Sequence, residues 1–286
     1  MKEIAYAKIN LGLNVLGKRA DGYHEVDMIM QSISLADELE FSPAESFLLT
    51  TDSEALACDD SNLVWKAAHL MGKIANRKPD VHIHIKKKIF MAAGLAGGSS
   101  DGAAVLRGLN RFWQLGLNVG ELESIAAQLG SDVPFCISGG TIRATGRGEI
   151  LKPLPDMPVM WLVLAKPSNI EVSTGWVYKN LGEKVEEIPS IDVLQSVLAG
   201  DNMESIAKNI GNVLEAVTIP AHPLIANIKE AMLQTGALAS LMSGSGPTVF
   251  GLTKERNVAE KIAKLWHGDI KMQIALAQTI QRSENK

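Results

Sequence analysis

A run of glycine and other small residues at positions 89–104, IFMAAGLAGGSSDGAA, has the composition of a loop that binds a phosphate group. Glycines let several main-chain N–H groups turn toward one anion, and the N-terminus of a following helix adds further unpaired N–H groups. No lysine follows these glycines, so the G-x-x-x-x-G-K-[ST] motif is absent, and Ala96 and Ser99 break the G-x-G-x-x-G pattern. On residue types alone, the stretch is as compatible with a flexible turn as with a phosphate site.

Two side chains elsewhere, Lys8 and Asp132, have the chemistry of a proton-transfer pair. The segment AYAKINLGLNV at 5–15 alternates as a strand, which places Lys8 and Asn10 on one face, opposite the apolar positions 7, 9, 11 and 13. Asp132 follows a predicted helix end at Gly130 and precedes a predicted extended step at 133–134. Its carboxylate could accept a proton from a hydroxyl, with a nearby ammonium favouring its ionised form. The alternatives are a solvated strand lysine and an ordinary turn aspartate.

Two glycine-containing turns present further polar groups. The turn GKRADGYHE at 17–25 offers Tyr23 and His24 from a loop, and loops on rigid scaffolds are where binding residues concentrate. The turn SGSGP at 243–247 either approaches a phosphate or only connects two strands, and connection is the simpler expectation.

The polar residues just before the glycine-rich loop have structural interpretations. His82 and His84 have the spacing of metal ligands, but no third ligand is placed to complete a site, so we do not expect a metal there. Lysines 86–88 are typical of an edge strand that avoids aggregation, although they directly precede the loop. The residues that would hold a metal therefore stay unknown from the sequence.

The hydrophobic pattern predicts the elements around these groups. A strand at 81–86 precedes the loop, and a helix follows it, N-capped by Ser99 or Ser100, with an apolar face at 103, 104, 106 and 109. Prolines in KPLPDMP, 152–158, predict a boundary between domains 1–155 and 156–286. The second part begins with a strand at 159–165. It continues with helices at 193–198, 203–217 and 223–233, strands at 237–242 and 248–252, and a helix at 257–266. This order predicts an α+β domain with an antiparallel sheet.

Composition excludes several classes of protein. The chain has 286 residues, 46% of them hydrophobic, so we expect packed cores, and a net charge of -4 argues against a nucleic-acid partner. Cys58 and Cys136 form no C-x-x-C pair, which favours a reducing, cytoplasmic location over a disulfide framework or a zinc ribbon. The longest apolar run, MPVMWLVLA, is too short to cross a bilayer, so no membrane association is expected.

Taken in order, these segments resemble the GHMP kinases, whose hallmarks are a P-x-x-x-G-L-G-G-G-S-S-type phosphate loop and a glycine-rich motif near the C-terminus. The resemblance covers nearly the whole chain. The opening AKINLGLNVLGKRADGYHEVDMIMQSISLAD and the segment DDSNLVWKAA look most like members that phosphorylate a cytidine diphosphate-linked methylerythritol in the non-mevalonate route to isoprenoid precursors. The resemblance implies a two-domain α+β fold, with an N-terminal ribosomal S5-like α/β domain and a C-terminal ferredoxin-like α+β domain.

The resemblance also implies roles for particular residues. Lys8 and Asp132 match the catalytic pair. The residues implied for ATP are Asn62, near the adenine, and the loop residues Phe90, Met91, Ala92, Ala93, Gly94, Leu95, Ala96, Gly97, Gly98, Ser99 and Ser100. Those implied for the acceptor are Asn10, Tyr23, His24 and Tyr178, with Tyr178 closing on the pyrimidine from the side opposite Tyr23 and His24. ATP and Mg²⁺ are the implied cofactors, a small molecule is the implied partner, and the chain is expected to be a monomer or a weak homodimer.

The loop departs from the family pattern. Phe90 replaces the usual proline, and Ala92, Ala93 and Ala96 occupy positions that are commonly glycine or, in one case, alanine. If Ala96 needs a positive φ, its β-carbon costs about 1 kcal/mol or more. Two alternatives therefore stay open: a GHMP kinase with another small alcohol as acceptor, and an inactive relative that binds nucleotide without turnover.

Overall fold

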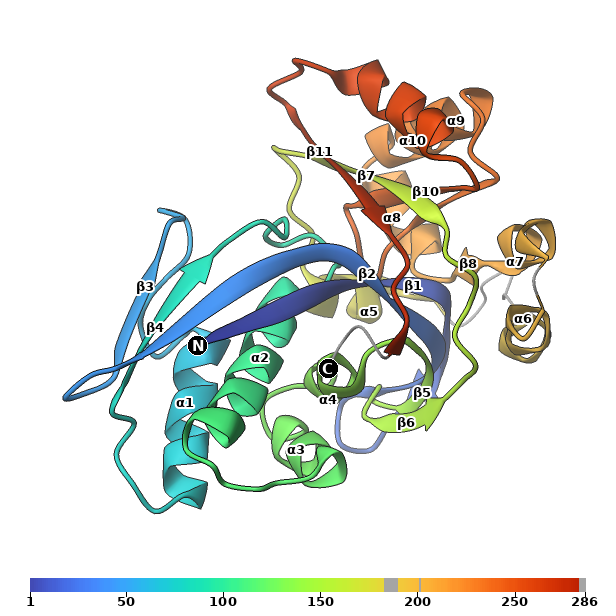
Figure 1. Cartoon of the computed structure of the whole chain (residues 1–286). Helices are drawn as coiled ribbons and strands as arrows, with labels where there is room; N and C mark the ends of the chain where they lie inside the picture. The colour runs from blue at the N-terminus through green and yellow to red at the C-terminus, as the bar shows by residue number, and fades with distance from the viewer. Residues whose placement is uncertain (183–189, 201, 283–286) are drawn as a thin grey trace.

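The computed structural model describes residues 1–182, 190–200 and 202–282, which form two β-sheets with helices packed around them (Figure 1). The first sheet has the order β3-β4-β2-β1-β8, and β5 pairs with both β2 and β6. Its strands are β1 (Lys2–Lys18), β2 (His24–Pro43), β3 (Leu48–Thr51), β4 (Val81–Lys86), β5 (Thr141–Gly146), β6 (Ile150–Pro153) and β8 (Gly211–Asn212). In Figure 1 four helices lie on one side of the long β1 and β2 ribbons: α1 (Leu63–Ile74), α2 (Gly97–Phe112), α3 (Val119–Ala126) and α4 (Val133–Ser138).

The second sheet is antiparallel throughout and has the order β11-β7-β10-β9. Its strands are β7 (Trp161–Pro167), β9 (Ala239–Met242), β10 (Val249–Thr253) and β11 (Met272–Gln278). The helices of this half are α5 (Thr174–Asn180), α6 (Ile191–Leu198), α7 (Met203–Asn209), α8 (Glu215–Ala221), α9 (Leu224–Gln234), α10 (Arg256–Ala263) and the short 3₁₀ helix η1 (Lys264–Trp266). The predicted α+β class and the antiparallel second sheet are confirmed.

The central strand β1 is buried on both faces, and a bulge decides which residues face the candidate site. Its apolar residues 7, 9 and 11 pack in one core with residues of the second sheet. The strand has a register shift between Asn10 and Gly12. A bulge inserts an extra residue and reverses the alternation beyond it. The predicted placement of Leu13 with 7, 9 and 11 is therefore wrong, since Leu13 lines the same cavity as Lys8 and Asn10.

Helix α2 begins earlier than predicted. Gly97 is its first residue and Ala96 is its N-cap, so neither Ser99 nor Ser100 caps the helix. Ala96 has a left-handed conformation that turns the loop directly into the helix, and no side chain is used for capping. The predicted apolar face is confirmed, since residues 103, 104, 106 and 109 are fully buried. This face packs α2 against β1 and places the N-terminus of the helix at the end of the loop.

Three further predictions differ from the structure, and one strand was missed. Strand β4 lies between β3 and β2, so lysines 86–88 do not mark a sheet edge. The predicted helix at 203–217 is split into α7, β8 and α8, because Asn212 pairs with Leu13 of β1 and its amide donates to the carbonyl of Gly244. The predicted extended step after Asp132 is instead the start of α4, where Pro134 occupies a first-turn position that needs no N–H. Strand β11 was not predicted at all.

The chain leaves the first sheet after β6 and enters the second at β7, and β8 later returns to pair with β1. The boundary between 155 and 156 stays a prediction. In the described residues, no helix has the length and apolar character needed to cross a membrane.

Candidate active site

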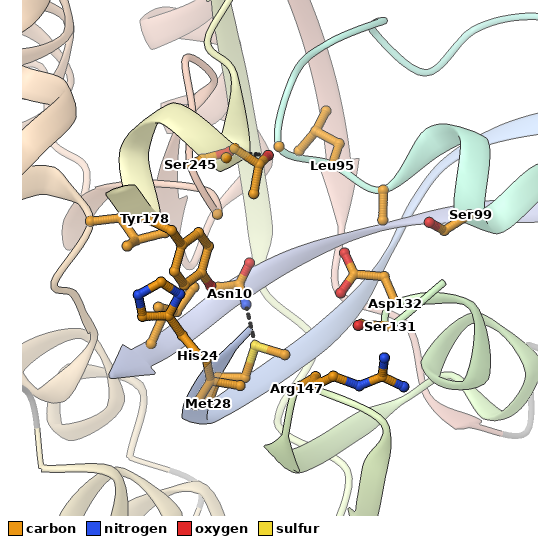
Figure 2. A pocket seen from close by; sticks show the side chains of 18 of the residues that line it. Asn10, His24, Met28, Leu95, Ser99, Ser131, Asp132, Arg147, Tyr178 and Ser245 are labelled. Atoms are coloured by element: carbon orange, nitrogen blue, oxygen red, sulfur yellow. Dashed lines mark hydrogen bonds between the residues drawn. The ribbon is translucent and has the colours of Figure 1, made fainter. Parts of the chain in front are cut away.

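A cavity of about 1540 Å³ opens where the glycine-rich loop, β1, the β1–β2 turn and α5 meet. Figure 2 shows side chains from these separate segments gathered around one space. Most of the predicted site residues line this cavity: Lys8, Asn10, Tyr23, His24, Asp132, Tyr178 and the loop residues 90–99. Asn62 and Ser100 do not line it.

The glycine-rich loop is held by backbone geometry and by a second loop. Ala92, Gly94 and Ala96 all have positive φ, at 48°, 71° and 57°. The hydroxyl of Ser243 donates to the carbonyl of Gly94 at 2.9 Å, and a β-carbon on Gly94 would lie only 2.1 Å from the carbonyl oxygen of Ser243. The turn at 243–247 therefore does more than connect two strands, because it braces the loop, and Ser245 also lines the cavity.

An Ala96→Gly variant is expected to be more stable than the wild type by about 0.5–1 kcal/mol, since glycine removes the left-handed penalty and only part of the gain is lost to chain entropy. Chemical unfolding measures the difference. The control is Ala93→Gly, because Ala93 is buried and has no positive φ, so the same change there should destabilise the protein. Equal effects of the two substitutions would contradict the expectation.

The serines at the start of α2 have different surroundings. Ser99 lines the cavity. Ser100 is buried behind the loop, where its hydroxyl donates to the carbonyl of Tyr6 and lies 3.3 Å from the sulfur of Cys136. Burial raises the pKa of the Cys136 thiol to about 12, so this sulfur is a packed neutral group. The part of the loop that faces the cavity therefore ends at Ser99.

Lys87 anchors the strand that precedes the loop, a role that differs from the predicted edge lysine. Its Nζ lies 2.5 Å from Oδ2 of Asp37 and 2.7 Å from Oδ2 of Asp101, and all three side chains are nearly inaccessible to solvent. Oδ1 of Asp37 also accepts from the backbone N–H of Ile89 at 2.8 Å. The trio ties β2, the loop and α2 together. Its sequence signal was the position of Lys87 directly before the loop.

The Asp101 carboxyl should make stability depend on pH. Burial raises the pKa of Asp101 from 3.8 to about 7, with Lys87 opposing the shift and Asp37 adding to it. In the unfolded chain the Asp101 carboxyl ionises near pH 3.8. Its contribution to the stability of the fold is therefore fully present below that pH and is lost as the pH rises toward 7. We expect a loss on the order of a few kcal/mol between pH 4 and pH 7.

Urea unfolding across pH 4.5–8 tests this dependence, with Asp101→Asn as the comparison. The amide does not titrate, so the stability of this variant should fall less steeply than that of the wild type. Parallel curves for the two proteins would mean that Asp101 is not responsible.

The candidate catalytic pair, Lys8 and Asp132, lines the cavity. Nζ of Lys8 donates to Oδ1 of Asn10 at 2.7 Å and lies 3.5 Å from Oδ2 of Asp132. Lys8 is buried, whereas about a third of the Asp132 side chain is exposed. Asp132 precedes α4 but makes no capping hydrogen bond, so its carboxylate is available to the cavity. The amide of Asn10 also donates to the sulfur of Met28 at 3.3 Å, which fixes its orientation (Figure 2).

Aromatic residues form one end of the cavity. The rings of His24 and Tyr178 lie 5.1 Å apart at an angle of 38° (Figure 2). Tyr23 is 53% exposed, and its ring lies 4.9 Å from the guanidinium of Arg147. Burial, with a smaller effect of Asp132, raises the pKa of the Tyr178 hydroxyl well above its usual value. The ring of His24 thus contacts Tyr178, whereas Tyr23 contacts Arg147. Arg147 lines the cavity and was not predicted, although the glycines on either side of it mark a turn in the sequence.

Three other sequence candidates have structural partners. Asn62 caps α1, since its Oδ1 accepts from the N–H of Val64 at 2.9 Å. His82 and His84 both contact the hydroxyl of Thr50, at 2.8 and 2.9 Å. Within the described part of the chain, no group of three or more His, Cys, Asp and Glu side chains is arranged to hold a metal.

Comparisons with known proteins place this chain in a family. The model described as "GHMP kinases N terminal domain" matches residues 62–140, and "GHMP kinases C terminal" matches 193–267. A 4-diphosphocytidyl-2-C-methyl-D-erythritol kinase of Enterococcus faecalis is 48% identical over 262 residues, covering 91% of this chain and 92% of that protein. A kinase of the same name from a Geobacillus species is 50% identical over 262 residues, covering 90% of each chain. The crystal structure of a 4-(cytidine 5'-diphospho)-2C-methyl-D-erythritol kinase has a TM-score of 0.83 at 31% identity and covers 98% of this chain and 100% of that one.

Proposed function

The chain belongs to the GHMP kinases, and we propose that it transfers the γ-phosphoryl group of ATP to the 2-hydroxyl of 4-diphosphocytidyl-2-C-methyl-D-erythritol, giving the 2-phosphate and ADP. The observation that carries the proposal is the position of the Lys8–Asp132 pair in one cavity between the glycine-rich loop and the His24–Tyr178 rings. This arrangement offers a phosphate site, a proton acceptor and an aromatic base site within a single space. In the pathway it would serve the non-mevalonate route to isoprenoid precursors.

Each end of the Lys8–Asp132 pair has a distinct part in the transfer. The Asp132 carboxylate accepts the proton of the acceptor hydroxyl as the oxygen attacks the γ-phosphorus. The Lys8 ammonium, held by Asn10, orients that carboxylate and offsets negative charge as it develops. The N–H groups of the loop and of the start of α2 contact the phosphates, so catalysis depends mainly on positioning and electrostatic stabilisation.

The aromatic end of the cavity suits the cytosine base. His24 and Tyr178 present a ring pair, and base stacking on such faces contributes about 1–3 kcal/mol per base. Tyr23 stands at the rim, exposed enough to close over a bound base. The predicted adenine contact of Asn62 is less direct, because its side chain caps α1, whereas its neighbour Leu63 lines the cavity.

Mg²⁺ is the proposed metal, and the donor set fits a cation held mostly by the nucleotide. Mg²⁺ in kinases uses one or two protein oxygens together with substrate phosphates. The Ser99 hydroxyl and the Asp132 carboxylate line the cavity, whereas Ser100 and Asp101 are bonded elsewhere. When bound, the ion would neutralise phosphate charge during transfer.

The test is ADP release with Mg-ATP and 4-diphosphocytidyl-2-C-methyl-D-erythritol, run beside homoserine, mevalonate and galactose. We expect turnover with the cytidyl compound alone. Turnover with another acceptor would assign a different GHMP activity, and ATP binding without any turnover would indicate an inactive relative. The predicted monomer or weak homodimer and the predicted cytoplasmic location are separate questions that this assay leaves as predictions.

A further inference from the structure

Arg147 stands in a turn that contacts the catalytic end of the cavity, although the roles above do not use it. The turn joins β5 to β6, and Arg147 lies between two glycines with positive φ. A β-carbon on Gly148 would lie 2.7 Å from Cε of Met28 and 3.8 Å from Cβ of Ser131. The turn therefore packs against the residue that precedes Asp132, as the positions of Arg147 and Ser131 in Figure 2 also show.

The same turn also contacts the aromatic end of the cavity. The Arg147 guanidinium lies 4.9 Å from the centre of the Tyr23 ring, a cation–π arrangement. The backbone N–H of Gly146 donates to Oε1 of Glu25 at 3.1 Å, which ties the turn to the start of β2. Arg147 is thus held between the β1–β2 turn and the loop that carries Asp132.

The donors of Arg147 are largely uncommitted. Its Nε lies 3.5 Å from Oε1 of Glu149, and its Nη groups have no hydrogen-bond partner among the described residues. The other inner cations of the cavity are engaged: Lys8 with Asn10 and Asp132, and Lys87 with two buried carboxylates. Lys18 and Lys179 also line the cavity but are exposed at its rim.

We propose that Arg147 binds the diphosphate group of the acceptor, an inference that rests on the proposed function. The acceptor carries its base and its polyol at opposite ends of a diphosphate. With the base at His24 and Tyr178 and the reacting hydroxyl at Asp132, the diphosphate passes the turn that bears Arg147. A guanidinium suits this task because its fork of N–H donors matches two phosphate oxygens, and its face is already fixed on Tyr23.

Calorimetric titration with cytidine and with cytidine diphosphate tests the assignment. A non-hydrolysable ATP analogue is kept at saturation so that the donor site is filled. The wild type is compared with Arg147→Gln and with the control Arg256→Gln. Arg256 also stacks on an aromatic ring, at 5.3 Å from Trp161, and pairs with Glu260, but it does not line the cavity.

Arg147→Gln should weaken cytidine diphosphate binding about 10- to 30-fold and cytidine binding no more than about 3-fold, because only the diphosphate gains charge-assisted hydrogen bonds. The KM for the acceptor should rise with the KM for ATP unchanged, and Arg256→Gln should match the wild type. A role confined to supporting Tyr23 would weaken both ligands equally, and that result would overturn the inference while leaving the proposed function intact. Failure of the wild type to bind either cytidine compound would overturn both.

Discussion

An Asp132→Asn variant is expected to lose about 10²- to 10⁴-fold in kcat, the range that general base catalysis contributes. The amide keeps the size of the side chain but cannot accept the hydroxyl proton. Lys8 keeps its hydrogen bond to Asn10, so the buried ammonium retains a partner and the fold should survive. The loop that we propose as the ATP site is unchanged, so the KM for ATP should stay near the wild-type value. Steady-state kinetics with both substrates measures these effects.

The control for Asp132→Asn is Asp80→Asn, which removes the same charge from an exposed pair with Arg77 at a position that does not line the cavity. Its activity should equal that of the wild type. An Asp132→Glu variant should keep part of the activity, because it restores the proton acceptor at a displaced position. Wild-type kcat in Asp132→Asn would remove Asp132 from the mechanism.

The sequence located part of the local elements, although it missed β2 and α1, and most of the residues that it predicted for the site line the cavity. Alternation of apolar residues located β4, a continuous apolar run located β7, and the 3.6-residue period located the buried face of α2. These signals depend on neighbours along the chain. The pairing of β8 with β1 depends instead on Asn212, whose amide donates to the carbonyl of Gly244 in the turn at 243–247. No pattern within 203–217 predicts that contact. β11 was missed although it pairs with β7 along its whole length.

The site shows the same division between local and long-range information. Lys8 and Asn10 were placed together by alternation, but the bulge after Asn10 that brings Leu13 to the same side has no clear local signal. The family pattern raised the question whether Ala96 needs a positive φ, and in the structure the φ of Ala96 is positive. Lys87 was read as a surface lysine because both of its partners lie far from it in sequence, one of them on β2.

A Lys87→Met variant is expected to lose about 3–5 kcal/mol of unfolding free energy, because breaking a buried ion pair leaves uncompensated charge. Asp37 would keep its backbone donors, among them the N–H of Ile89. Asp101 would be left without a donor. Its Oδ1 is already buried without a hydrogen-bond partner among the described residues, and its Oδ2 would lose the hydrogen bond from Lys87. The loss of Lys87 should raise the pKa of Asp101 further, because the lysine is the main influence that lowers it.

Measuring the destabilisation at two pH values and in a double variant separates the effect of uncompensated charge from the loss of side-chain packing. The destabilisation by Lys87→Met should be larger at pH 8 than at pH 5.5, because protonation of Asp101 removes one of the two charges left behind. Adding Asp101→Asn to Lys87→Met should recover much of the loss at pH 8. The matched control is Lys86→Met at the neighbouring position, whose exposed pairs with Glu38 and Glu40 should contribute little. If Lys87→Met were as stable as Lys86→Met, the trio would not anchor the loop. If its deficit were the same at both pH values, the cause would be packing, because only the charged trio makes the stability of the loop junction depend on the protonation of Asp101.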